Sequence, residues 1–206
     1  AAADQLIIAW ARTYNINYNT AAQNNVFGFS AGTVGFEKLG SGILTFDLLQ
    51  TYTGATVISG GTILLGASNV LPTTTAVTVS TCLTTACYTV DSLVVAKLDI
   101  ADKSNTVGGV TLTHGSIVGT TGVLTGTSYT LNPTSGVTVT ASAILAGASS
   151  TLTKSDSGIA NLSGNNTYSG NTAINAGVLS ITDITSLPGW NTNGRYSVES
   201  GATLAV

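Results

Sequence analysis

The sequence predicts an all-β protein of the β-solenoid type, in which short strands wind into stacked coils. Runs that alternate apolar and polar residues follow one another along the chain, which is typical of strands rather than helices. A segment of 37 residues recurs 116 positions later, and the chain contains 35 threonines. A long-period repeat made of such strands favours a solenoid over a sandwich or a barrel. Coils of a parallel solenoid stack about 4.8 Å apart.

The expected strands are separated by turns that contain glycine or asparagine. In the first copy of the repeat, strands at 56–58 and 62–65 flank Gly61, and in the second copy strands at 172–174 and 178–181 flank Gly177. Glycine permits the positive φ that such tight turns need. Between the two copies we expect further strands at residues 76–79, 92–100, 109–113, 122–125, 129–131 and 136–140.

The two copies of the repeat, residues 36–72 and 152–188, align without a gap. Twelve of their 37 positions are identical, more than chance readily produces in an ungapped alignment. The identical pairs are Lys38/Lys154, Ser41/Ser157, Gly42/Gly158, Ile43/Ile159, Thr51/Thr167, Tyr52/Tyr168, Gly54/Gly170, Thr56/Thr172, Ile58/Ile174, Gly61/Gly177, Leu71/Leu187 and Pro72/Pro188.

Within each copy lies a motif that resembles the autotransporter-associated β-strand repeat, also called the passenger-associated transport repeat. Residues 164–179 and 51–64 follow the family pattern N-T-Y-T-G-x-T-x-I-x-x-G-T-L, and the first copy departs from it at Gln50, where asparagine is usual. The resemblance implies a right-handed parallel β-helix that a diderm bacterium secretes. In this family the repeat marks a fold and a secretion route rather than a chemistry.

We expect structural roles for the motif residues. The glycines would allow tight turns, the tyrosines would pack at coil corners and the prolines would end strands. These positions are Tyr52, Gly54, Thr56, Ile58, Gly61, Pro72, Tyr168, Gly170, Thr172, Ile174, Gly177 and Pro188.

Composition narrows the classes of function and the compartment. The formal net charge is −3 with only six Lys and Arg, which excludes a nucleic-acid binder that works through a basic patch. No stretch reaches the roughly 18 apolar residues that a membrane helix needs.

The start at Ala1 resembles a mature chain after signal-peptide cleavage, with a shortened chain as the alternative. Cys82 and Cys87 favour a disulfide across a turn, with two free thiols as the alternative.

The sequence predicts no catalytic, cofactor-binding or metal site. A polysaccharide-cleaving β-helix needs clustered carboxylates, whereas the nine acidic residues here are scattered. The tightest set of acidic residues is most simply explained as a solvated turn with its own ion pairs. It consists of Asp99 and Asp102, which lie beside Lys97 and Lys103. His114 lies in a Thr/Gly-rich strand without a partner that suggests a triad.

The two ends of the chain suggest self-association. The chain stops on an apolar strand without a charged cap, and open solenoid ends invite pairing with another chain. The segment 1–35 diverges from the solenoid expected at 36–206, and it either completes a neighbour's coil or folds back on its own chain. The expected subunit contacts are Ile7, Trp10, Tyr14, Ile16, Tyr18, Val198, Leu204 and Val206.

The preferred function is therefore that of a non-enzymatic extracellular structural protein, which forms a surface fibre or filament with itself as partner. The first alternative is an adhesin or passenger fragment that displays a binding surface for cell-surface glycans, which an exposed aromatic or charged patch would reveal. A carbohydrate-cleaving β-helix enzyme ranks last.

Overall fold

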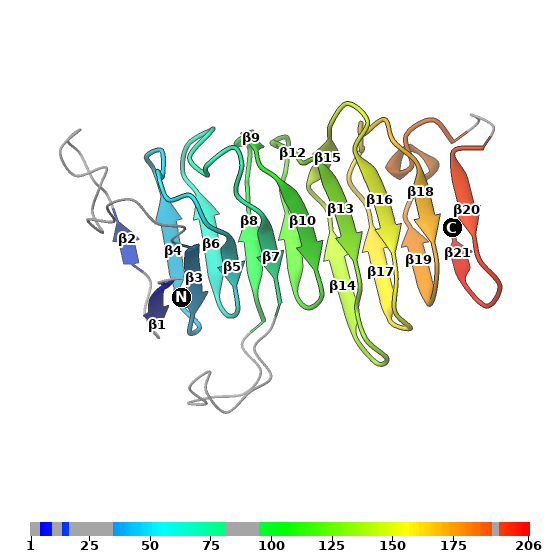
Figure 1. Ribbon diagram of the computed structural model, residues 1–206, viewed down its shortest axis with the longest axis horizontal. Helices are drawn as coiled ribbons and strands as arrows, with labels where there is room; N and C mark the ends of the chain where they lie inside the picture. Colours follow the sequence, from blue (N-terminus) through cyan, green and yellow to red (C-terminus); the bar gives the residue numbers. More distant parts are fainter. Residues whose placement is uncertain (1–4, 10–13, 17–34, 81–94, 191–193) are drawn as a thin grey trace.

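The expected all-β solenoid is confirmed by a computed structural model, in which parallel strands stack along a rod (Figure 1). The structure describes residues 5–9, 14–16, 35–80, 95–190 and 194–206, the first two ranges by backbone only. The chain advances from β1 and β2 at one end of the rod to β20 and β21 at the other (Figure 1). None of the described helices is both long and apolar enough to cross a membrane.

Two nine-stranded parallel sheets run the length of the rod. The first sheet contains, in order, β1 (Gln5–Ala9), β3 (Gly35–Leu39), β5 (Thr56–Ile58), β7 (Val77–Val79), β10 (Gly109–Leu112), β13 (Ser128–Leu131), β16 (Thr151–Lys154), β18 (Thr172–Ile174) and β20 (Tyr196–Val198). The second contains β2 (Tyr14–Ile16), β4 (Ile43–Phe46), β6 (Thr62–Leu65), β8 (Lys97–Asp99), β11 (Ser116–Val118), β14 (Thr138–Ala141), β17 (Ile159–Leu162), β19 (Val178–Ile181) and β21 (Thr203–Ala205).

A short third sheet closes the middle of the rod. It consists of β9 (Asn105–Thr106), β12 (Val123–Thr125) and β15 (Ile144–Ala146). Elsewhere along the described part of the rod, turns and the 3-10 helix η2 (Ile184–Ser186) connect the second sheet to the first. The chain thus returns to the first sheet after each coil.

The core consists of in-register columns, because alternate residues of every strand point inward. One column of the first sheet runs through Ile58, Val79, Leu112, Leu131 and Ile174, all of which are buried. Burial of each such aliphatic side chain contributes roughly 1.5–3 kcal/mol. The same column also contains the buried side chains of Lys38 and Lys154.

The expected strands agree with the observed ones to within a few residues, with one exception. Of the run expected at 92–100, the structure describes residues 95–100, and only Lys97–Asp99 of these form a strand, β8. Val95 and Ala96 lie before this strand. Cys82 and Cys87 lie outside the described residues, as do Trp10 and Tyr18.

The N-terminal strands belong to the solenoid of their own chain. β1 pairs in parallel with β3, and β2 pairs in parallel with β4. Both pairs join strands of one chain, and the alternative in which this segment completes a neighbour's coil stays a prediction. Ile7 lies in register with Glu37, Tyr14 with Leu44 and Ile16 with Phe46.

Candidate functional site

The most unusual buried groups are the lysine ammonium groups of the two repeats. Lys38 is 2% exposed, and its Nζ donates hydrogen bonds to the carbonyls of Leu39 at 2.6 Å, Gly40 at 2.8 Å and Gly60 at 3.2 Å. Lys154 is 0% exposed and donates to the equivalent residues Ser155, Asp156 and Ala176 at 2.7–3.0 Å. Each ammonium thus binds three carbonyls from two adjacent coils, which satisfies its three donors.

Burial lowers the pKa of both lysines. Desolvation lowers the Lys38 pKa to about 8, and it lowers the Lys154 pKa against the opposing effect of the Asp156 carboxylate. Lys38 is therefore charged at neutral pH, and the carbonyl oxygens replace the water that its ammonium loses. The sequence comparison shows Lys38 and Lys154 as an identical pair but does not assign them a role. One feature of the sequence could have indicated such a role: both copies of the repeat have a lysine at an inward position of an apolar strand.

Each lysine lies against a glycine turn that has no space for a side chain. Gly61 and Gly177 have φ values of +64° and +66°. A Cβ at Gly177 would lie 2.4 Å from the Gly158 oxygen, 2.5 Å from the Asp156 oxygen and 2.8 Å from Lys154 Nζ. The expectation that these glycines allow positive-φ turns is confirmed, and the close approach of the neighbouring coil adds a second reason for glycine.

The repeat tyrosines are tied to the repeat threonines. Tyr52 Oη lies 2.6 Å from Thr56 Oγ1, and Tyr168 Oη lies 2.8 Å from Thr172 Oγ1. Both threonines are buried at inward positions of the first sheet, so these hydrogen bonds satisfy hydroxyls within the core.

These paired arrangements repeat in the two segments that one known family covers. The family model described as Passenger-associated-transport-repeat matches residues 36–65 and 152–181. Two segments of the chain are thus similar to the passenger-associated transport repeat. The comparisons with curated proteins and with solved structures find no match.

Each passenger-associated transport repeat therefore spans two neighbouring coils, β3 to β6 and β16 to β19. The lysine reaches from the first of these coils to the second, and the glycine packs against it from the second. Contacts between two consecutive coils thus explain why the lysine and the glycine have the same spacing in both copies of the repeat.

The prolines do not have the role expected of them. Pro72 and Pro188 do not end strands, since β6 already ends at Leu65 and β19 at Ile181. They lie in the turns that return to the first sheet, where the Pro188 carbonyl accepts a hydrogen bond from Tyr196 Oη at 2.5 Å.

The departure at Gln50 interrupts an asparagine contact. In the second repeat Asn166 is buried, accepts a hydrogen bond from Leu145 N and donates one to the Ser186 carbonyl. The corresponding Gln50 instead donates to the Leu48 carbonyl. Asn105, which lies outside both repeats, also accepts hydrogen bonds from the backbone of the preceding coil, from Val70 N and Leu71 N.

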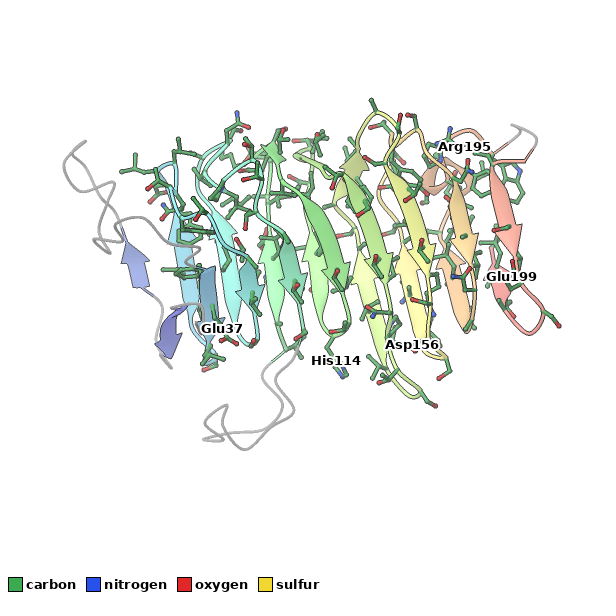
Figure 2. The ribbon with its side chains drawn as sticks, viewed as in Figure 1. Glu37, His114, Asp156, Arg195 and Glu199 are labelled. Atoms are coloured by element: carbon green, nitrogen blue, oxygen red, sulfur yellow. The ribbon has the colours of Figure 1, made fainter. Side chains whose placement is uncertain are left out.

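The charged residues do not converge on one site in the described part of the chain. Lys97 pairs with Asp99 at 3.2 Å and Lys103 with Asp102 at 2.9 Å, as expected for a turn with its own ion pairs. No group of three or more His, Cys, Asp or Glu that could hold a metal ion occurs among the described residues. Figure 2 shows Glu37 near the N-terminal end of the rod, away from Asp156 and Glu199 in its C-terminal part.

The remaining candidate is the last described coil, formed by β20 and β21. Each of these strands is the last in its sheet and has one hydrogen-bonded neighbour. Val198 continues the column of Ile174 but is 48% exposed, whereas Ile174 is 1% exposed. Leu204 continues the column of the buried Leu179, and Val206 is 83% exposed. The structure therefore brings together the three C-terminal residues expected from the sequence.

An aromatic pair lies beside this coil. The rings of Trp190 and Tyr196 are 5.7 Å apart, and Trp190 is 46% exposed. Arg195 is held by the carbonyls of Tyr168 and Gly170. Its guanidinium therefore anchors the last coil to the preceding one (Figure 2).

Ionisation of the buried tyrosines gives a first testable result. Desolvation raises the pKa of both Tyr129 and Tyr168 to about 12. Because their pKa is near 10 in an unfolded chain, the stability that they contribute is complete below pH 10 and is lost as pH rises through 12. We expect phenolate absorbance and loss of the β circular-dichroism signal to coincide above pH 10. A Tyr168→Phe variant should lose less stability over this range, and an unchanged pH dependence would contradict the assignment.

Proposed function

We propose that this chain is a non-enzymatic structural segment of a secreted or cell-surface protein of a diderm bacterium, and that it self-associates into a filament through its open ends. The two passenger-associated transport repeats and the parallel solenoid support the passenger-like rod. The family is one of surface-directed proteins, which supports the location.

The observation that carries self-association is the exposure of apolar side chains on the coil of β20 and β21. Its inward column positions hold Tyr196, Val198 and Leu204 rather than charged residues, so the end of the rod is apolar. Edge strands with free backbone groups and exposed apolar side chains pair readily with further strands. A filament built in this way continues the contacts that already join successive coils within the chain.

An edge-blocking substitution tests this function. Val198→Pro removes the backbone N–H at the free edge of β20, and proline is tolerated on edge strands. We expect the wild-type chain to form long unbranched filaments in negative-stain electron microscopy and to sediment in proportion to its concentration. The Val198→Pro variant should remain as short rods under the same conditions.

Val198→Thr is the matched control, because it keeps the N–H and a β-branched shape of similar size. Filaments should persist in this variant. Wild-type protein that stays monodisperse over the whole dilution series would overturn the proposed self-association.

One observation supports a display function as the second candidate. The exposed Trp190, whose ring lies tilted beside that of Tyr196, offers an aromatic surface of the kind that binds sugars. Under this alternative, Trp190→Ala should abolish retention of the chain on a cell-surface glycan array without changing its assembly. A carbohydrate-cleaving function would require facing carboxylates, and no such pair was found among the acidic side chains of the described ranges.

A further inference from the structure

A sequence motif for sugar attachment lies in the second repeat. The chain contains two Asn-x-Ser/Thr triplets whose middle residue is not proline, and they begin at Asn161 and at Asn165. In such a triplet the side-chain nitrogen of the asparagine is the acceptor for an N-linked sugar. A third triplet, residues 132–134, has proline at its centre and does not qualify. The two remaining triplets begin four residues apart but have different surroundings.

Asn165 lies outside the sheets, in the segment that joins β17 to β18. Exposed and buried residues alternate along this segment from Ser163 to Ser169. Because side chains two positions apart in extended backbone point to the same side, Asn165 and Thr167 are both exposed. The acceptor amide and the hydroxyl that completes its triplet therefore face solvent together.

The middle residue of this triplet holds the segment in place from the inside. Asn166 is 4% exposed, its Oδ1 accepts a hydrogen bond from Leu145 N at 2.8 Å, and its Nδ2 donates one to the Ser186 carbonyl at 2.8 Å. These two bonds connect Asn166 to the preceding coil and to the following one. With Asn166 fixed inward, the side chain of Asn165 is held on the surface.

The one hydrogen bond of the Asn165 side chain uses its oxygen. Asn165 Oδ1 accepts from Thr185 Oγ1 at 2.9 Å, where both residues are exposed. Asn165 Nδ2, to which a sugar would be attached, donates no hydrogen bond within the described part of the chain. Attachment at the nitrogen leaves the carbonyl oxygen as an acceptor. The contact with Thr185 is therefore compatible with a sugar on Asn165.

Asn161 is much less accessible. It lies within β17 at an outward position, in register with Thr140 of β14 on one side and Ser180 of β19 on the other. Neighbouring strands of a sheet lie about 4.8 Å apart, so side chains flank the Asn161 amide on both sides, and the residue is only partly exposed. An enzyme that must surround the asparagine side chain has access to Asn165 and not to Asn161 in the folded rod.

We propose that Asn165 is an N-glycosylation site, at which a glycosyltransferase attaches a sugar to Nδ2. The donor is a sugar activated by a phosphate group on a nucleotide or a lipid carrier. A bond forms between Nδ2 and the anomeric carbon of the sugar, while the bond from that carbon to the phosphate oxygen breaks. The carrier phosphate leaves with the bonding electron pair, and the proton from Nδ2 passes to a basic group of the transferase. This assignment does not depend on self-association.

Peptide mass spectrometry of the full chain, purified from the cells that produce it, tests the assignment. We expect the proteolytic peptide that contains Asn165 to carry a sugar on this residue, located by electron-transfer fragmentation. A single sugar would indicate a nucleotide-linked donor, and an oligosaccharide transferred as one block would indicate a lipid-linked donor. Either result supports the site.

Three further variants, made in the same cells, test the triplet. Asn165→Gln removes the acceptor, and Thr167→Ala removes the hydroxyl, so both should abolish the modification. Thr167→Ser keeps a hydroxyl and should remain glycosylated. Asn161→Gln is the matched control, which should leave the sugar on Asn165 unchanged. Circular dichroism checks that each variant retains the β signal, which we expect because none of these side chains belongs to the buried core.

Other outcomes would overturn the assignment. Asn165 without a sugar in the chain from the producing cells would do so, as would a sugar on Asn161 in its place. Full modification of the Thr167→Ala variant would show that the triplet does not direct the reaction, and it would likewise contradict the proposal. Filament formation does not enter this test, so its result is separate from that of the proposed function.

Discussion

Alanine at Gly177 is expected to lower the free energy of unfolding by at least about 3 kcal/mol, which is among the largest effects of a single methyl group. The methyl group would lie within 2.5 Å of the carbonyl oxygens of Gly158 and Asp156. These atoms belong to the backbone of the preceding coil and cannot rotate away. The φ of +66° adds about 1–2 kcal/mol of strain for any residue with a Cβ. Urea unfolding followed by circular dichroism measures the change.

Gly136→Ala is the matched control for this experiment. Gly136 also has a positive φ, +79°, but no atom lies within 4 Å of its Cβ position. This variant should lose only the strain component, about 1–2 kcal/mol. Equal losses in the two variants would mean that backbone conformation alone, and not contact between coils, requires the glycine of the repeat.

Lys38→Met should lower the free energy of unfolding by about 2–3 kcal/mol at pH 7, because three carbonyls that now receive a charged donor would lose it. Methionine keeps the length and apolar stem of lysine, so the variant tests the ammonium rather than packing. The loss is limited because removal of the ammonium also relieves its desolvation. Lys103→Met is the control: Lys103 pairs with Asp102 at the surface, and its removal should change stability by no more than about 0.5 kcal/mol.

The pH dependence separates a charged lysine from a purely structural one. The folded-state pKa of Lys38 is about 8, below the value near 10.5 of an unfolded chain. Between these values the unfolded chain binds more protons, so the wild-type free energy of unfolding should rise from pH 8 to pH 10. The Lys38→Met variant should show a smaller rise. Wild-type and variant curves that run parallel over this range would contradict a buried ammonium at Lys38.

The repeat pattern predicted much of the local structure because strand alternation and glycine turns act over a few residues. The strands around Gly61 and Gly177 are where the sequence places them, and the two repeats were recognisable from residues such as Tyr168, Gly170 and Thr172 alone. These features depend on the order of residues along one strand and one turn.

Other features required the stacking of coils. The pattern did not reveal that Lys38 binds carbonyls of two coils, because Gly60 lies 22 residues further along the chain. It misplaced the function of Pro72 and Pro188, since the return path to the first sheet is fixed by packing and not by the proline ring. The hydrogen bonds that Asn105 accepts from Val70 N and Leu71 N, about 35 residues earlier in the chain, are likewise visible only across coils.

By itself the sequence determined an all-β solenoid, its turns and its family repeat, because periodicity and glycine placement encode local backbone geometry. Only the tertiary structure decided that the N-terminal strands pair with β3 and β4, and that the ammonium groups of Lys38 and Lys154 bind carbonyls of two coils. The register of parallel strands joins residues about 20 or more positions apart, and no local pattern specifies which of the possible registers buries the columns best.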